Sequence, residues 1–286
     1  MKTLVKKMPD SFNIFLFGDR HVGSYGFFEK GFAKMIGLME DEYDGIQPKH
    51  NFGLDHGDNI EAITIDDKRF DLLSTKEASI LAQLAEDRKL LKPIASRLIA
   101  LLDGNHPRKL HRFGEITEEQ CSQLGVPFGS YTCRISYVAK DGSLIFKHYA
   151  AHGFRSINST LDDEELRVAR MRNTLKRILR RKAGDCLLMT MGHTHKLLVK
   201  KPDDFLYLYT EGKKFREGYT GSLDFNNSFF VPENHRWYGN TGTFRRSLME
   251  GKTDYGEMAG YDPIELGLLV AKVRDRELVD LEEVRV

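Results

Sequence analysis

An acidic side chain and a histidine stand two residues apart, directly after the first strongly apolar stretch of the chain. Residues 12–17 predict a buried strand that ends at Gly18, and Asp19 and His21 follow it. In extended backbone, residues i and i+2 point to the same side, so a carboxylate oxygen and an imidazole nitrogen can face one point, as a transition metal prefers. An Asp after a strand is more often a turn former, so this pair alone does not establish a metal site.

Similar polar clusters follow four later segments that resemble strands. The five clusters are Asp19 with His21, Asp58, Asn105 with His106, His152, and His193 with His195. Each has an ordinary structural explanation, such as a Gly-Asp-Asn turn or a hydrogen-bonded histidine. Together they offer nitrogen and oxygen donors without a thiolate, which suits two ions such as Mn, Fe or Zn rather than calcium. Two ions that share one carboxylate would use all of these side chains except His106, which is left for general acid catalysis.

The elements that must position these clusters alternate between strands and helices. We expect helices over 25–39, 75–91, 118–124 and from Asp162 or Asp163 to Lys182. In the second of these, Thr75 would be the cap and Ala78, Leu81, Leu84 and Ala85 would face inward; in the last, Leu166 would face inward. We expect strands over 98–102 and 186–191, a hairpin of 131–139 and 144–151, and a terminal hairpin of 266–273 and 278–286. A polar cluster after each strand is typical of a wound α/β sheet, so we predict the α/β class.

Composition narrows the class of protein. The chain has 286 residues, 41% hydrophobic and 30% charged, which is normal for a globular protein that buries a core, and its net charge of +1 gives no overall attraction to nucleic acid or membrane. We find no domain boundary and expect a single domain over 1–286. Three widely spaced cysteines favour a reducing compartment, and neither a signal peptide nor a membrane span is visible, so we predict a cytoplasmic protein.

Two further features bear on partners. The predicted helix up to Lys182 has a basic outer face, which can contact a polyanion but is more often simply solvated. Its basic residues are Arg167, Arg170, Arg172, Lys176, Arg177, Arg180, Arg181 and Lys182. Aromatic residues gather after the last histidine pair, and many must be core, although some can stack a base. They are Phe205, Tyr207, Tyr209, Tyr219, Phe225, Phe229, Phe230, Trp237 and Tyr238.

The ordered set Gly-Asp-x-His, Gly-Asp-x-x-acid, Gly-Asn-His, His-Gly and Gly-His-x-His resembles the calcineurin-like metallophosphoesterases, and it spans Gly18 to His195. The resemblance implies a four-layer αββα sandwich of two mixed sheets, with both metals at the strand ends. It further implies that residues 197–286 carry substrate-side loops and closing strands. The segment 239–243 looks like the family's Asn-x-Gly-Ser segment on a core strand.

Carried over position by position, the resemblance implies a role for each cluster. Asp19, His21 and His195 would hold the first metal, Asn105, His152 and His193 would hold the second, Asp58 would bridge them, His106 would meet the leaving group, and Glu61 would orient His106. The implied cofactors are two divalent ions, Mn in the first place, with Fe or Zn as alternatives. Asn105 would also donate to the substrate.

This sequence departs from the family pattern at three places. Arg20 stands where many members have a small or apolar residue, so we expect it either to reach a substrate phosphate or to be a solvated loop residue. Pro107 and Arg108 follow His106 where an acidic residue is common. Ala62 follows Glu61 where protein phosphatases typically have an arginine, which argues against a protein phosphatase.

The predicted activity is phosphodiester hydrolysis of a nucleotide or nucleic-acid substrate by a hydroxide between the metals, with a charged His106 protonating the leaving oxygen. A phosphomonoesterase is the alternative. A binding scaffold of the same fold is a third reading, and it is disfavoured because such relatives typically lose ligands and this chain has lost none. The sequence leaves the oligomeric state open.

Overall fold

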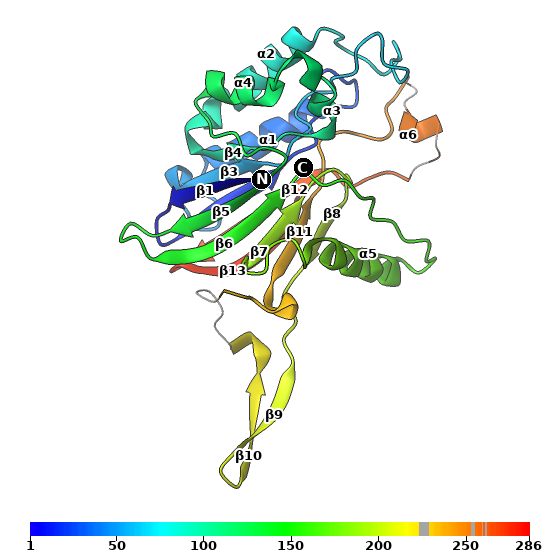
Figure 1. Cartoon of the computed structure of the whole chain (residues 1–286). Helices are drawn as coiled ribbons and strands as arrows, with labels where there is room; N and C mark the ends of the chain where they lie inside the picture. Colours follow the sequence, from blue (N-terminus) through cyan, green and yellow to red (C-terminus); the bar gives the residue numbers. More distant parts are fainter. Residues whose placement is uncertain (223–228, 253–254, 259, 261) are drawn as a thin grey trace.

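Two mixed β-sheets and their covering helices form a mixed α/β structure (Figure 1). The computed structural model describes residues 1–222, 229–252, 255–258, 260 and 262–286. In spatial order, the six-stranded sheet contains β1 (Lys2–Lys7), β5 (Thr132–Val138), β6 (Leu144–Ala151), β7 (Leu188–Met191), β11 (Trp237–Thr241) and β8 (Leu197–Lys200). The five-stranded sheet contains β13 (Glu277–Arg285), β12 (Gly267–Arg274), β2 (Phe12–Phe17), β3 (Asn51–Asp55) and β4 (Leu98–Leu101).

The remaining elements lie outside the two sheets. The helices are α1 (Glu29–Glu40), α2 (Ile80–Leu91), α3 (Asn105–Arg108), α4 (Ile116–Leu124), α5 (Glu164–Leu179) and the short α6 (Tyr255–Met258). Strands β9 (Leu206–Glu211) and β10 (Lys214–Tyr219) form a separate antiparallel hairpin that projects away from the rest of the chain in Figure 1. Within the described ranges, no helix combines the length and the hydropathy needed to cross a membrane.

Strand directions bring the polar clusters to a common edge. In the five-stranded sheet β2, β3 and β4 are parallel, and in the six-stranded sheet β6, β7 and β11 are parallel. The carboxyl ends of parallel strands meet at the same edge of a sheet, where open α/β sheets bind ligands. The polar residues that follow β2, β3, β4, β6 and β7 therefore gather at two neighbouring edges.

Side chains of β2 alternate between two cores because successive residues of a strand point to opposite faces. Phe12, Ile14 and Leu16 join one buried cluster with Ile135 of β5 and Leu188 of β7, so the two sheets share this core. This apolar contact holds the two sets of strand ends against each other, which is what a site built from both sheets requires.

The other faces of the sheets pack against helices. Phe15 and Phe17 of β2 belong to a second cluster with Phe32 and Met35 of α1. A third cluster joins Leu175 and Leu179 of α5 to Met189 of β7. Residues of α1 thus pack with β2, and residues of α5 pack with β7.

Most predicted elements are confirmed, and their boundaries need correction. The strand over 12–17 is confirmed to the residue, and Asp163 caps α5, where its side chain accepts a hydrogen bond from the Leu166 backbone N–H at 2.8 Å. The first helix begins at Glu29 rather than at residue 25, because residues before it pair with other loops. The lysine-rich edge strand β1 was not anticipated; it pairs in parallel with β5.

The predicted inward face of α2 is confirmed at Leu84, which is buried, and wrong at Ala78, Leu81 and Ala85, which are exposed. The helix begins after Ser79, which caps it in place of Thr75, and Leu81 is 78% exposed. Its buried residues include Gln83 and Asp87, polar side chains that apolar periodicity assigns to the surface. Leu166 of α5 was also expected inward and is 60% exposed. In α2 the polar contacts described below decide which face turns inward.

Candidate metal centre

Five of the predicted ligands lie on backbone in the left-handed region. The φ angles are 51° at Asp19, 53° at His21, 50° at Asp58, 71° at His193 and 56° at His195. For residues other than glycine this conformation costs on the order of 1 kcal/mol each and persists only where the surroundings fix it. Such outliers concentrate at functional sites, and here they fall on the tight turns that follow β2, β3 and β7.

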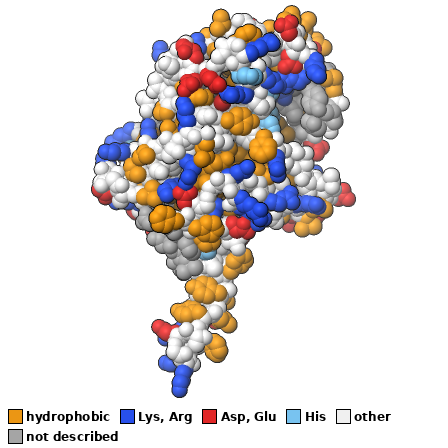
Figure 2. Space-filling model, viewed as in Figure 1, with side chains coloured by type: hydrophobic (Ala, Val, Ile, Leu, Met, Phe, Trp, Pro, Cys, Tyr) orange, Lys and Arg blue, Asp and Glu red, His pale blue; other side chains and the backbone are white. Residues whose placement is uncertain are grey.

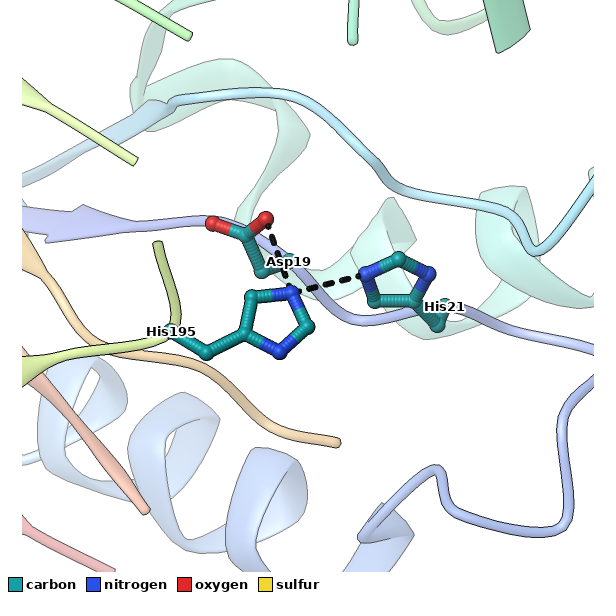
Figure 3. Close-up of side chains that lie close together, drawn as sticks. All are labelled: Asp19, His21 and His195. Atoms are coloured by element: carbon teal, nitrogen blue, oxygen red, sulfur yellow. Dashed lines mark hydrogen bonds and ion pairs between the residues drawn. The ribbon is translucent and has the colours of Figure 1, made fainter. Parts of the chain in front are cut away.

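Asp19, His21 and His195 form a first group of possible ligands (Figure 3). The Nε2 atoms of His21 and His195 face each other at 3.2 Å, and Asp19 Oδ1 lies 3.4 Å from His195 Nε2. Asp19 Oδ1 is buried and has no hydrogen-bond partner among the described residues. A buried, unpartnered carboxylate oxygen beside two imidazole nitrogens is the donor set that a divalent cation would complete.

Asp58, His152 and His193 form a second group, and Asn105 completes it. The amide oxygen Asn105 Oδ1 lies 2.9 Å from His152 Nε2 and 2.6 Å from His193 Nδ1. Asp58 Oδ2 lies 3.3 Å from His152 Nε2 and 4.0 Å from His21 Nε2, so this one oxygen is close to both groups. The arrangement suits a carboxylate shared between two cation positions.

Hydrogen bonds behind two histidines leave their Nε2 atoms pointing into the site. His152 Nδ1 donates to the backbone oxygen of His56 at 2.8 Å, and His21 Nδ1 donates to Glu61 Oε2 at 2.8 Å, because both partners can only accept. A histidine whose Nδ1 carries the proton presents a free Nε2 lone pair to a metal, and a carboxylate behind it raises its basicity. Both rings are therefore held with Nε2 directed into the site, where this nitrogen can bind a metal once it carries no proton.

The expected partner of Glu61 requires correction. Its carboxylate oxygen Oε2 is 2.8 Å from His21 Nδ1 but 3.9 Å from His106 Nδ1, so it supports His21 first. His106 Nδ1 instead donates to the backbone oxygen of Glu61 at 2.5 Å. His21, Glu61 and His106 also lie close enough together to form a third possible cation group. The hydrogen bond from His21 explains this proximity without a further cation.

Charges within the site shift several pKa values. Burial alone would raise the pKa of Asp58, but His152, His106 and His21 together lower it well below its ordinary value. Burial likewise opposes ionisation of Asp19, whose pKa is lowered by His195 and His152. Burial would lower the pKa of His152, yet Asp58 and Asp19 raise it to about 9. Both carboxylates are thus kept ionised, as metal binding requires.

His106 lies at the entrance of the site, with 14% of its side chain exposed. Its backbone N–H donates to Asp58 Oδ1 at 2.8 Å, which ties the residue to the shared carboxylate. Burial, with help from the neighbouring His21, lowers the pKa of His106 to about 4. In the metal-free chain the neutral form of this side chain is therefore favoured at pH 7.

Arg20 is not a substrate-binding residue in this structure. Its side chain is completely buried and points away from the site, where it forms ion pairs of 2.7 Å with Asp55 and 2.8 Å with Asp87. Its guanidinium also stacks over the rings of Phe17 and Phe32. Both expectations for Arg20, contact with a substrate phosphate and a solvated loop position, are wrong because carboxylates behind the turn take up its hydrogen-bonding capacity.

Two glycines let the loops approach the carboxylates. A Cβ added at Gly104 would lie 2.0 Å from Asp58 Oδ1, and one added at Gly192 would lie 2.7 Å from Asp19 Oδ2. These positions therefore leave no room for a side chain. The Gly-Asn-His and Gly-His-x-His spacings place the donors that follow each glycine directly against a carboxylate.

Arg245 also belongs to this edge, and sequence reasoning did not single it out. It follows β11, whose carboxyl end lies beside that of β7, and its Nε is 3.9 Å from Glu61 Oε2. Its side chain is 17% exposed, so it adds a partly buried cation next to the histidines. The signal was available in principle: Arg245 follows a core strand, as every other candidate in the site does.

The basic helix and the aromatic stretch lie elsewhere. Three basic residues of α5 and Arg180 at its C-cap form ion pairs: Arg167 with Glu164, Arg172 with Glu283, Lys176 with Asp203 and Arg180 with Glu233. Lys and Arg side chains still line the α5 surface in Figure 2. His195 precedes the start of β8, whereas the aromatic residues of β9 and β10 come after its opposite end. Tyr238 is buried, and Phe225 lies outside the described residues.

Comparisons with known proteins add little. A scan against protein-family models gave no match, and a search of curated proteins gave none. Among solved structures, the chain is similar to that of a conserved uncharacterized protein, a predicted phosphoesterase, from Streptococcus pneumoniae TIGR4. The identity is 13%, the match covers 96% of this chain and 98% of that chain, and the TM-score is 0.28. A likeness at this level bears on neither the activity nor the site.

Proposed function

We propose that the chain is a metal-dependent phosphoesterase that hydrolyses phosphodiesters of the nucleotide or nucleic-acid type. The observation that carries the proposal is the convergence of two donor groups on one shared carboxylate, Asp58, beside the buried and unpartnered Asp19 Oδ1. The three buried clusters support the finer part of the fold prediction, a four-layer αββα sandwich, as part of the same proposal.

The residues fit a pair of divalent cations, for which Mn is our first choice because the donors are imidazoles, carboxylates and one amide oxygen. Asp19, His21 and His195 would hold one ion, Asn105, His152 and His193 the other, and Asp58 both. When bound, such a pair supplies Lewis-acid charge and lowers the pKa of a coordinated water.

The chain's own groups then account for orientation and proton transfer. Glu61 and the His56 backbone oxygen fix the tautomers of His21 and His152. Because His106 Nδ1 is tied to the Glu61 backbone oxygen, Nε2 is the atom left to exchange a proton with the leaving group. An anionic substrate next to His106 raises its lowered pKa, which lets the ring carry that proton when the bond breaks.

Arg245 supports a substrate that carries more than one anionic group. Its Nε lies 3.9 Å from Glu61 Oε2, and the backbone oxygen of Glu61 accepts from His106 Nδ1. A fixed cation that borders the reacting group can bind a phosphate next to the one being cleaved, as a nucleotide or nucleic acid provides.

The test is to incubate the manganese-reconstituted protein with bis-nitrophenyl phosphate, nitrophenyl phosphate and single-stranded DNA side by side. We expect turnover of the diester and the DNA to exceed that of the monoester, and EDTA to abolish all three. Elemental analysis that finds no bound ion after reconstitution would overturn the proposal, and preferred cleavage of the monoester would overturn its diester part.

A further inference from the structure

A buried polar cluster lies directly behind the two turns that carry the shared site. We call it the Asp87 cluster; its members are Arg20, Asp55, Asn59, Asp87 and Gln120, and each is at most 1% exposed. None of them belongs to the predicted ligand set. They come from the β2 turn, β3, the β3 turn, α2 and α4, so the cluster joins five separate parts of the chain.

Arg20 connects the first turn to α2. It stands between Asp19 and His21, and its side chain points to the opposite side from theirs. Arg20 Nε donates to Asp87 Oδ1 at 2.8 Å, and Nη2 donates to Asp87 Oδ2 at 3.1 Å. Nη1 donates to Asp55 Oδ2 at 2.7 Å. This two-point contact with Asp87 fixes both the position and the plane of the guanidinium.

Asn59 connects the second turn to the same carboxylate. It follows Asp58 directly, and its Nδ2 donates to Asp87 Oδ2 at 3.3 Å and to Gln120 Oε1 at 2.6 Å. Gln120 in turn donates to Asp87 Oδ2. The Asp87 carboxylate therefore accepts hydrogen bonds from both turns: from Arg20, which stands between two predicted ligands, and from Asn59, which follows the shared ligand.

The two turns also touch each other through their backbones. Asp19 N–H donates to the Gly57 oxygen at 2.8 Å, and His21 N–H donates to the Asp58 oxygen at 3.0 Å. Backbone contacts of this kind hold the two turns side by side, and Asp87 contacts both turns from α2 behind them. His21 Nε2 and Asp58 Oδ2, one from each turn, lie 4.0 Å apart.

Stability alone does not explain such a cluster. Replacing a buried ion pair by packed apolar residues is often neutral or stabilising, because desolvation of the charges cancels much of their attraction. Buried polar groups are better explained where they select one arrangement of the chain from several. Here the arrangement they select is that of the two turns that must present ligands to a common point.

We propose that Asp87 is a positioning residue that sets the spacing of the two cation sites by clamping the Asp19–His21 and Asp58–Glu61 turns together. The inference rests on the proposed function, because it assigns Asp87 a role in metal binding. It predicts that a change on α2, away from every ligand, alters how the second cation binds in the presence of the first.

The experiment compares Asp87→Asn with the wild type and with a control, Leu91→Ala. Leu91 lies on the same helix, is completely buried and packs in the apolar cluster behind β2, so its truncation destabilises α2 while every side chain of the Asp87 cluster is kept. Mn²⁺ affinity and stoichiometry are measured by titration calorimetry, and the magnetic coupling between two bound Mn²⁺ ions by electron paramagnetic resonance. Thermal unfolding of the metal-free proteins records the structural cost.

We expect Asp87→Asn to weaken Mn²⁺ binding about 10–100-fold and to change the coupling signal, the scale seen when a residue behind a ligand is replaced. Leu91→Ala should lower the melting temperature while its Mn²⁺ affinity stays that of the wild type. If Asp87→Asn fails to fold, Gln120→Leu removes one arm of the clamp and keeps the Arg20 ion pairs; it should weaken Mn²⁺ binding in the same direction by a smaller factor.

The failures are distinguishable. If the wild type binds no Mn²⁺, the proposed function fails. If the wild type binds two ions and the folded Asp87 and Gln120 variants bind them with unchanged affinity and coupling, the cluster is merely structural and the inference is overturned.

Discussion

The ligand-bearing turns and the β9–β10 hairpin show two opposite ways of ordering a short segment. The turns after β2 and β3 have no regular secondary structure, yet their polar side chains are buried, and His21 and Asn59 donate hydrogen bonds to carboxylates. The hairpin has regular backbone pairing over 206–219, yet every residue of β9 is exposed. In this protein, order at the site comes from side-chain contacts, and order in the hairpin comes from backbone pairing.

Among the described strands, β9 and β10 are the ones least covered by other parts of the chain. Leu206, Leu208 and Phe215 are 53%, 66% and 82% exposed, and Figure 2 shows hydrophobic side chains along the projecting segment. A two-stranded hairpin alone is at best marginally stable in water. We therefore expect changes in the hairpin to have local effects only, and changes behind the turns to affect the whole site.

The sharpest way to break the comparison is to exchange one carboxylate for an amide in each region. Asp58→Asn should remove bound Mn²⁺ and reduce phosphodiester hydrolysis at least about 10³-fold, because it removes a ligand close to both cation positions. The matched change Glu217→Gln on β10 should leave both unchanged. Metal content and initial rates check this, and an active, metal-loaded Asp58→Asn protein would contradict it.

Hydrogen exchange should show an inverted pattern of protection. The amides of Asp19, His21 and Val22, which donate to the turn after β3, should exchange only by near-global unfolding. The strand amides of 206–219 should exchange by local opening and at least about 10³-fold faster, since global opening of a domain costs roughly 5 kcal/mol or more. Exchange measured by NMR or mass spectrometry checks this; equal protection of the two regions would remove the distinction.

His106→Asn tests proton donation to the leaving group, a role in the reaction and not in the stability of the fold. General acid help matters most for a poor leaving group, so hydrolysis of an alkyl phosphodiester should fall at least about 10²-fold while bis-nitrophenyl phosphate is affected little. The two substrates control for each other in one assay. An equal loss on both would assign His106 a role other than proton donation.

Acid should lower the stability of the two sheets through their buried histidines. The hairpin should not contribute to this effect, because 206–219 contains no histidine. Burial lowers the pKa of His56 to about 4, and it lowers that of His148 well below the ordinary value. Unfolded histidine binds its proton near pH 6.5, so the stability from each neutral ring is complete above that pH and is lost as the pH falls toward 4. For His56 the loss is about 3 kcal/mol. Denaturant unfolding of the EDTA-treated protein between pH 7 and 4.5 checks this; a flat profile would contradict it.

The smallest effect belongs to the hairpin itself. Phe215→Ser removes a side chain that is 82% exposed, so the free energy of unfolding should change by less than about 0.5 kcal/mol. A loss of several kcal/mol would show that the hairpin is part of the cooperative unit and would remove the contrast between the two regions.

The residues of the candidate site were visible in the sequence because each follows a predicted strand, and parallel strands bring such residues to one edge. Spacing alone could not show that the Glu61 carboxylate lies closer to His21 than to His106, since that depends on how two turns lie against each other. The roles of Asp19, His21 and the other ligands stay predictions until metal binding is measured.

The fold was predictable where apolar periodicity reports burial, as over 12–17. Apolar periodicity was misleading at α2, where Gln83 and Asp87 turn inward although they are polar. Arg20 was misassigned for the same reason: a charged residue in a turn is usually solvated, and only the position of Asp87 on a distant helix shows that this one is buried. Paired buried charges leave no hydrophobic signal for sequence reasoning to find.

The place of β2 between β3 and β12 has a consequence for biosynthesis. The strand that leads into Asp19 is translated long before its second neighbour, because β12 follows β2 at a great distance along the sequence. Until then one side of β2 offers unpaired backbone groups to other nascent chains. A message truncated before codon 267 should thus yield an aggregating product that chaperones retain, even though it encodes every candidate ligand.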